Sequence, residues 1–234
     1  MDIQVLGTGS KGNCYRISDG KTSLLLDCGL PVKKIKEGLK YRLSDIDGCL
    51  LTHEHFDHSK AARDMLKAGI DVYMSEGTRD ALNINESHRL NIVEPKKQFR
   101  LGSLEVMPFD TQHDAKEPLG YLVGSNATRE VLLYATDTYY LKYKFPGLTH
   151  VMVECNYIKD ILDNNLYAGK IPLTLRDRLV ESHFSLDNLK NFFRANDLSK
   201  VKEIWLIHMS DGNCDEQRAK KEIQEVTGKL VYVP

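Results

Sequence analysis

The sequence predicts an α/β fold in which helices cover β-sheets. Short β-type runs open the chain and recur through most of its length, and amphipathic helical segments are interspersed among them. The 234 residues are enough for one well-buried core and somewhat short for two ordinary domains. Because no linker-like segment interrupts the pattern, we expect residues 1–234 to form a single domain.

The first elements are predicted from turn and periodicity signals. Asp19-Gly20 favours a hairpin turn between two β-type runs. Val32, Ile35 and Leu39 are spaced as on one face of a helix. A second helix is expected over 59–69, with Ser59 as its N-cap and Gly69 at its C-terminal end. Strands are expected over 3–7, 14–18, 23–29 and 45–53, and the first helix over 31–42.

The rest of the chain continues this alternation. Segment 159–178 is the least regular, and we expect it to be a loop or a short helix. Further strands are expected near 70–75, 104–110, 120–124, 131–137, 150–156 and 203–210, and further helices near 76–83, 185–197 and 215–226.

The composition is that of a soluble globular protein, with 28% charged and 41% hydrophobic residues. With 32 basic and 33 acidic side chains, the net charge gives no general attraction to nucleic acid, so a polyanion would need a local positive patch or metal ions. The five cysteines are scattered singly, which favours a reducing compartment. No signal peptide or apolar span is evident, so we expect a cytoplasmic protein that does not enter membranes.

The stretch "LLTHEHFDHS" at residues 50–59 is the main functional signal. In an extended chain residues i and i+2 point the same way, so His53 and His55 can bind one ion. Asp57 and His58 would then turn toward a second ion. Crowding these groups without a cation would be unfavourable, which makes a metal site the preferred interpretation.

Further ligands must come from elsewhere, and three candidates each follow a strand-like run: His113, Asp137 and His208. A single histidine at a strand end is more often solvated or hydrogen-bonded, so each candidate alone is a weak signal. The histidines favour zinc, and the carboxylates leave manganese as an alternative. The full assignment is His53, His55 and His113 at one ion, Asp57, His58 and His208 at the other, and Asp137 with a water or hydroxide shared between them.

Residues 7–12, "GTGSKG", match the dinucleotide-binding pattern GxGxxG letter for letter. That function requires a helix to follow the glycines, whereas the next residues, 13–18, are β-type. We therefore expect a glycine loop between two strands near the metal site.

"THEHFDH", together with Asp27, His113, Asp137 and His208, resembles the motif set of the metallo-β-lactamase superfamily over the whole chain. The resemblance implies a four-layer αββα sandwich with a two-metal site at the edge of its sheets. It also implies that Asp27 is not a ligand and instead orients a ligand histidine. The alternative is an aspartate that only terminates a strand.

The segment "SHFSLDNLKNF", residues 182–192, resembles a module of the phosphodiesterase branch of this superfamily, in which the histidine contacts the scissile phosphate. This implies that His183 protonates the leaving oxygen and that Ser185 lies near the substrate. The alternative is a surface histidine beside a helix that Ser185 or Asp187 caps. "GTGSKGN", "HDAKEP", "TDTYY", "VECN" and "HMSDGN" extend the likeness to the small exonucleases of the YycJ/WalJ type.

That resemblance implies 5′-to-3′ hydrolysis of DNA by a hydroxide shared between two zinc or manganese ions, with Asp57 and His183 as catalytic residues. Local basic groups could attract the phosphate backbone, namely Lys33, Lys34, Lys36, Arg176 and Arg178. The alternative is that these groups are only solvated, as basic residues on helices often are. A phosphodiesterase for small cyclic nucleotides is the first alternative, and a thioester or lactone hydrolase the second. A homodimer is a further expectation. Tyr157 departs from the family, which commonly has a histidine there, so the substrate pocket is the least certain part of the likeness.

Overall fold

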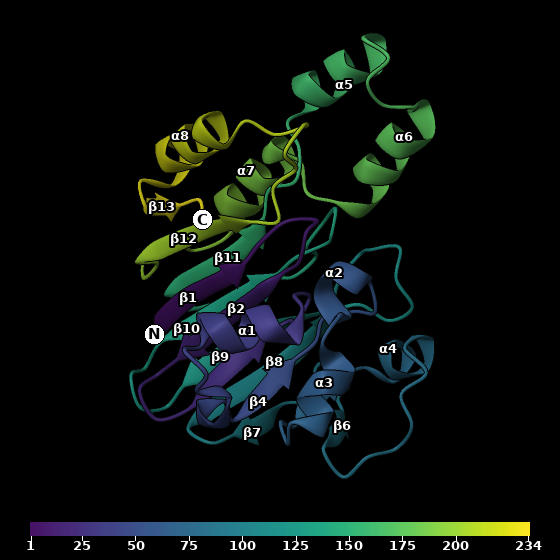
Figure 1. The fold of residues 1–234 in the computed structure, drawn as a ribbon. Coiled ribbons are helices and arrows are strands. Elements are labelled where there is room, and N and C mark those ends of the chain that lie inside the picture. The colour runs from purple at the N-terminus through teal and green to yellow at the C-terminus, as the bar shows by residue number, and fades with distance from the viewer. The chain divides into compact units, whose positions relative to one another are not determined.

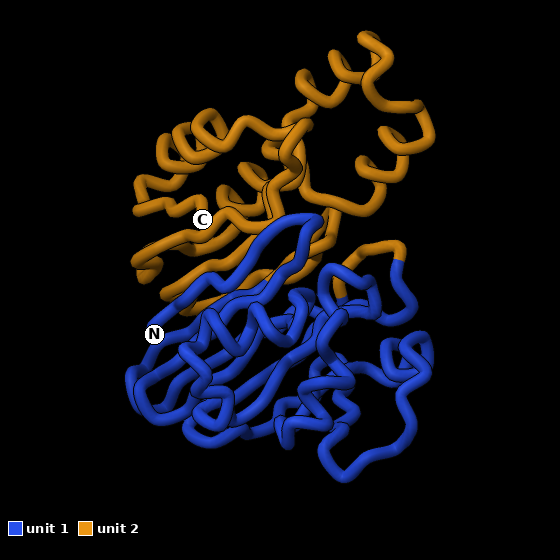
Figure 2. The backbone as a smooth tube through the Cα atoms, in the orientation of Figure 1, with its two compact units in different colours: residues 1–110, 115–134 blue, residues 111–114, 135–234 orange.

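A computed structural model describes residues 1–234, and their contacts group them into two compact units. Unit 1 comprises residues 1–110 and 115–134, and unit 2 comprises residues 111–114 and 135–234 (Figure 2). The single domain expected for the whole chain stays a prediction.

The first sheet of unit 1 has six strands in sequence order. The first three are antiparallel and the next three join in parallel, which requires crossover connections. The hairpin predicted at Asp19-Gly20 joins the second and third strands. These strands are β1 (Asp2–Gly7), β2 (Cys14–Ser18), β3 (Ser23–Leu26), β4 (Gly48–Leu50), β5 (Val72–Met74) and β6 (Leu90–Ile92).

Four further strands of unit 1 form an antiparallel array in the order β10-β9-β8-β7. Alternate residues of β8 are buried, as expected for a strand with one face against a core. The Tyr121 hydroxyl of β9 donates a hydrogen bond of 2.6 Å to the carbonyl of Leu51, just after β4, and so links the array to the first sheet. The strands are β7 (Phe99–Leu101), β8 (Leu104–Asp110), β9 (Leu119–Ser125) and β10 (Val131–Ala135).

Helices cover the other face of the first sheet in unit 1 (Figure 1). Ile35 of α1 and Met65 of α3 are fully buried in one apolar cluster with Cys49 and Leu51 from the sheet side. The elements are α1 (Val32–Gly38), the 3-10 turn η1 (Leu43–Asp45), α2 (Phe56–Ser59), α3 (Ala62–Lys67) and α4 (Glu76–Ala81).

The prediction that Ser59 caps a helix is wrong. The chain is already helical from Phe56, so Ser59 is the last residue of α2, and its hydroxyl donates to the carbonyl of Glu54 at 2.7 Å. The second half of the histidine motif therefore lies on a helix. Gly69, with φ of 86°, follows α3 as predicted.

Unit 2 contains three parallel strands, β11 (His150–Glu154), β12 (Glu203–Ile207) and β13 (Leu230–Tyr232). Helices α7 (Leu186–Ala195) and α8 (Glu216–Thr227) pack against each other, and α8 also contacts β13 (Figure 1). None of the helices is both long and apolar enough to pass through a membrane.

Segment 159–178 is more regular than expected. It forms α5 (Lys159–Tyr167) and most of α6 (Leu173–Ser182). Only Leu162 and Ser182 of these helices are buried, and apolar residues such as Leu173 and Leu175 lie at the surface.

Candidate metal centre

Unit 1 gathers the four residues of the histidine motif. His53 and His55 follow β4 in an extended segment, and Asp57 and His58 lie on α2. The ring centroid of His53 lies 4.7 Å from that of His55 and 4.3 Å from that of His58. The change from strand to helix within six residues explains how so short a motif turns its side chains toward a common region.

Asp27 is the buried acceptor behind this group. It follows β3 with φ of 57°, a left-handed conformation that aspartate tolerates better than most residues. Its Oδ2 accepts hydrogen bonds from His58 Nδ1 at 2.8 Å and from the Tyr134 hydroxyl at 2.6 Å. Its Oδ1 accepts from the Thr52 amide at 2.8 Å. Asp27 therefore fixes the ring of His58 and presents His58 Nε2 on the side away from the carboxylate.

Thr52 fixes a second ring. Its hydroxyl lies 2.9 Å from Asp27 Oδ1 and 3.0 Å from His53 Nδ1. Because the ionised carboxylate can only accept, the hydroxyl donates to Asp27 and accepts from His53 Nδ1–H. The lone pair of His53 is then on Nε2.

The glycine loop expected near the metal site connects β1 to β2 and ends at Asn13. The buried Asn13 amide nitrogen lies 3.1 Å from His58 Nε2 and 3.4 Å from Asp57 Oδ2. Gly29 lies so close to α2 that a Cβ atom there would be 1.7 Å from the Asp57 carbonyl oxygen. Both contacts fix the position of α2. Neither Asn13 nor Gly29 was predicted from the sequence to be a site residue.

In unit 2, Asp137 lies between two histidines. Its Oδ2 is 3.4 Å from His113 Nε2, and its Oδ1 is 3.5 Å from His208 Nε2. Two ligand atoms on one tetrahedral zinc ion lie about 3.3 Å apart, given bond lengths of about 2.0–2.1 Å. The two oxygens of Asp137 thus have the spacing needed to serve a different ion each.

Two of these residues occupy strained positions at strand ends. Asp137 follows β10 with φ of 49°, and His208 follows β12 with φ of 51°. Such left-handed conformations cost about 1–3 kcal/mol outside glycine and concentrate at functional sites. The strain sets the direction in which both side chains leave the strands.

His113 is held as a neutral imidazole. Its Nδ1 lies 2.9 Å from the carbonyl oxygen of Ser182, which can only accept, so Nδ1 carries the proton and Nε2 the lone pair. Burial lowers the pKa of His113, and Asp137 offsets this only in part. A neutral ring with an available Nε2 is the form that binds a metal ion.

Glu154, at the end of β11, is a site residue that the sequence analysis did not identify. It is fully buried, and its Oε1 is hydrogen-bonded to His183 Nδ1 and lies 3.3 Å from His208 Nδ1. Its Oε2 accepts from the amides of Thr138 and Phe184 at 3.1 and 3.2 Å. The signals in the sequence are an acidic residue that closes the buried run "HVMVE" and its place in "VECN", one of the stretches shared with the YycJ/WalJ type.

His183 and Glu154 form an ion pair. Burial alone would lower the pKa of His183, but the Glu154 carboxylate raises it above its usual value. For Glu154 the directions are reversed. Burial alone would raise the pKa of its carboxyl, but His183 lowers that pKa below its usual value. The ring of His183 stacks at 5.6 Å on that of His208 and meets that of His113 edge-on at 5.1 Å. His183 therefore lies among the ligand candidates of unit 2.

The donor chemistry of both units fits divalent metal ions. His53, His58 and His113 each have Nδ1 engaged by a neighbour. His58 Nε2 lies 3.4 Å from Asp57 Oδ2, and the Nε2 atoms of His113 and His208 lie 3.4 and 3.5 Å from the oxygens of Asp137. Asp137, Glu154, His183 and His208 offer ligand atoms within 4.8 Å of one another. Histidine and carboxylate donors of this kind bind zinc or manganese.

The other side chains predicted to lie near the substrate or to attract it are bonded to residues of the protein itself. The Ser185 hydroxyl caps α7 by accepting from the Asn188 amide at 3.1 Å. Arg176 pairs with Asp163 and Asp177, and Arg178 pairs with Asp114 at 2.7 Å. These pairs neutralise both arginines, which weakens their expected attraction for a phosphate backbone.

Comparison with known proteins identifies the family. A model of the β-lactamase superfamily domain matches residues 22–209. The chain is 30% identical to the exodeoxyribonuclease WalJ of Streptococcus pneumoniae over 89% of this chain and 81% of that protein. It is 26% identical to the exodeoxyribonuclease YycJ of Bacillus anthracis over 97% of this chain and 89% of that protein.

A solved structure shows the same fold. The metallo-β-lactamase fold protein YhfI of Bacillus subtilis superimposes with a TM-score of 0.76 and 15% identity over 99% of this chain and 95% of that one. This likeness and the family match confirm the predicted αββα metallo-β-lactamase fold.

Proposed function

Because the chain belongs to the metallo-β-lactamase superfamily, we propose that it is an exonuclease that hydrolyses phosphodiester bonds in DNA. It is a metal-dependent hydrolase, as the family match and its exodeoxyribonuclease relatives show. The observation that carries the phosphodiester assignment is the contact between His183 and Glu154, since a buried, protonated imidazole beside ligand candidates suits protonation of an alkoxide.

The proposal places two divalent ions, zinc or manganese, in the site. His53, His55 and His113 would hold one, Asp57, His58 and His208 the other, and Asp137 both. The support within unit 2 is that each oxygen of Asp137 faces a different histidine Nε2. The support within unit 1 is the contact of Asp27 with His58, in which Asp27 would act as the orienting carboxylate.

When bound, the ions would lower the pKa of a water that becomes the shared hydroxide nucleophile and polarise a phosphate oxygen. Asp57, with its side chain 24% exposed, would orient that nucleophile. His183 would donate a proton to the leaving oxygen of the sugar, and Glu154 would keep that proton on the ring until it is needed. We further propose that digestion runs from the 5′ end.

The test is digestion of linear DNA labelled at either end, with zinc or manganese supplied. We expect a 5′ label to be released at once as a mononucleotide, a 3′ label to be released last, and a covalently closed circle to stay intact. Asp137→Asn should abolish the activity while its circular dichroism spectrum and melting temperature match those of the parent protein.

Other outcomes separate the alternatives. Intact linear DNA with both metals would refute the exonuclease. Cleavage of cyclic mononucleotides without cleavage of DNA would instead favour a small-molecule phosphodiesterase. Hydrolysis of thioesters or lactones without cleavage of DNA, retained in full by His183→Ala, would favour a thioester or lactone hydrolase in which His183 has no role as proton donor.

A further inference from the structure

Unit 2 has a cavity of about 320 Å³ beside the residues just described. One wall is the irregular segment 140–144, and the other is α7 with the residue before its cap, Phe184. Its volume is near the lower end of the roughly 300–1,000 Å³ typical of ligand sites, which suits one small planar group better than a large ligand.

Both walls of this cavity are tied to the candidate metal centre. The segment 140–144 begins three residues after Asp137, and the Thr138 hydroxyl donates to the Tyr140 carbonyl at 2.8 Å. The Thr138 amide in turn donates to Glu154 Oε2 at 3.1 Å. The opposite wall starts at Phe184, directly after His183, and its amide donates to the same Glu154 oxygen.

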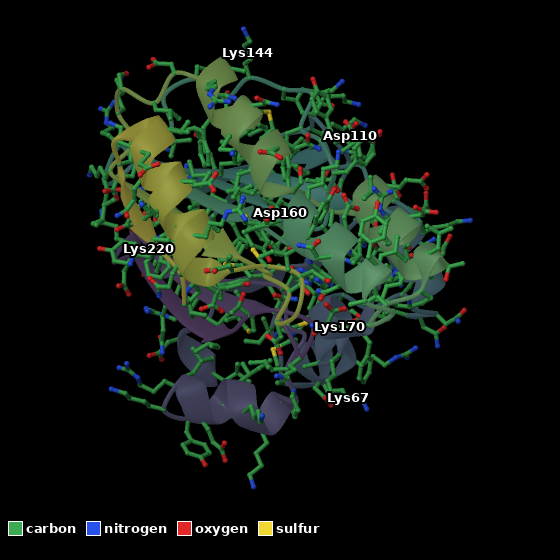
Figure 3. All side chains as sticks on the ribbon, turned by 90° about the horizontal axis from the view of Figure 1, so that it is seen from above. Lys67, Asp110, Lys144, Asp160, Lys170 and Lys220 are labelled. Atoms are coloured by element: carbon green, nitrogen blue, oxygen red, sulfur yellow. The ribbon has the colours of Figure 1, made fainter.

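Hydrogen bonds from the residues that flank segment 140–144 also join this segment to α7 and the residue after it. The Asn188 side-chain amide of α7 donates to the Tyr139 carbonyl at 3.2 Å. At the far end the Phe145 amide donates to Asn196 Oδ1 at 3.0 Å, just after α7. The cavity thus extends along α7 from the His183 end toward Lys144, which Figure 3 labels beside that helix.

The lining combines aromatic rings with positive charge. Phe184 and Phe192 are buried and give the cavity an apolar base. Tyr140 is 54% exposed, so a large aromatic face is available to a ligand. Lys142 and Lys144 are exposed on the same segment, and the Lys142 ammonium lies 5.3 Å from the centroid of the Tyr143 ring.

Aromatic rings alternating with lysines are the features by which proteins hold single-stranded nucleic acid. Bases stack on the rings whatever their sequence, and the cations meet the phosphates. Amide side chains such as Asn188 and Asn191 can hydrogen-bond to base edges in addition. The chemistry therefore points to a nucleobase with its adjoining phosphate.

We propose that this cavity is a stacking subsite for a base of the DNA strand, near the phosphate that is cleaved, with Tyr140 as the stacking residue. The inference rests on the proposed function, and it adds that the enzyme prefers a strand end with at least one unpaired nucleotide. Since stacking recognises every base, the subsite confers preference for single-stranded ends and little sequence preference.

The test compares Tyr140→Ala with Tyr140→Phe, which keeps the ring. On a single-stranded oligonucleotide we expect Tyr140→Ala to raise KM about tenfold with kcat little changed, because one base–aromatic stack is worth roughly a factor of ten or more. Tyr140→Phe should restore the parent KM. Tyr167→Ala, at an 86% exposed tyrosine of the same unit outside the cavity, is the matched control and should change neither constant.

An abasic oligonucleotide removes the base of the DNA instead of the ring of Tyr140. With abasic sites at the terminal nucleotides, the parent enzyme should show the raised KM, and Tyr140→Ala should add no further loss. Equal KM values for Tyr140→Ala and the parent on intact strands would overturn the subsite.

Binding separates this result from the proposed function. In the Asp137→Asn background, which should leave DNA uncut, terminal 2-aminopurine should be quenched on binding, and Tyr140→Ala should remove most of the quenching. Quenching that does not depend on Tyr140 would refute the subsite. A parent enzyme that fails to cut DNA would refute the exonuclease, whatever the quenching shows.

Discussion

The carboxylate of Glu154 is hydrogen-bonded to Nδ1 of His183, and both side chains are buried. The same carboxylate accepts the amides of Thr138 and Phe184 through its other oxygen. Glu154 therefore connects the residue after Asp137 with the residue after His183. Loss of the negative charge of this carboxylate should therefore act mainly on the proton of His183.

Glu154→Gln should lower kcat for linear DNA about 10- to 100-fold, the usual effect of losing a supporting carboxylate. The amide cannot hold a proton on His183 as the carboxylate does. Thymidine 5′-(4-nitrophenyl) phosphate, whose leaving group needs no proton, should be hydrolysed nearly as fast by the variant as by the parent. Glu181→Gln, at an exposed glutamate of the same unit, is the control. An equal loss on both substrates would mean that Glu154 acts through the metal ions.

Asp27→Asn should weaken metal binding by about 10- to 100-fold without removing a ligand. The neutral amide is a poorer acceptor for His58 Nδ1, and its NH2 group must face one of the donors that now surround Asp27. Competition with a chromophoric chelator measures the affinity, with exposed Asp45→Asn as the matched change. An unchanged affinity would make Asp27 only a strand-terminating residue.

The residues that could be predicted from the sequence are those that follow a local pattern. His53 and His55 are found from i, i+2 spacing, and the other ligand candidates from their positions after apolar runs, where β8, β10 and β12 do end before them. The 3.6-residue period found α7 and α8, whose apolar faces are buried.

The parts that were missed depend on long-range contacts. Glu154 pairs with His183 across 29 residues of sequence, and Asn13 reaches His58 across 45. Both residues stand in stretches that the family likeness includes, "VECN" and "GTGSKGN", but no local pattern predicts which histidine each contacts. Ser59 was wrongly predicted to cap a helix because the histidine motif is already helical from Phe56, about one turn before Ser59.

Among the glycine-to-alanine changes in unit 1, we expect Gly29→Ala to damage the site most. The new Cβ would lie 1.7 Å from the Asp57 carbonyl oxygen, so α2 would have to move away. We expect a loss of about 3 kcal/mol or more in the free energy of unfolding, at the upper end of overpacking effects, together with loss of metal binding. Gly124→Ala, whose Cβ would meet only the Glu105 carbonyl at 3.9 Å, is the control and should cost far less. Equal denaturant midpoints for the two variants would contradict this prediction.

Asp19 gives unit 1 a stability that depends on pH. Burial alone would raise the pKa of Asp19, but hydrogen bonds from the Thr22 and Lys21 amides and from the Ser125 and Ser103 hydroxyls hold it well below its usual value. A carboxyl whose pKa is lower in the folded protein stabilises it above the unfolded pKa of about 3.9, and this contribution is lost as the pH falls toward the folded value.

Asp19→Asn should therefore lower the free energy of unfolding by about 1–3 kcal/mol at pH 7, because charged acceptors make the stronger hydrogen bonds. The difference from the parent should shrink steadily below about pH 4, where the parent's carboxyl becomes protonated in the unfolded chain. Urea titrations between pH 3 and pH 7 measure it, with Asp45→Asn, at an exposed aspartate of the same unit outside this network, as the comparison. A difference that stays constant over this range would show that the charge of Asp19 adds nothing to the hydrogen bonds themselves.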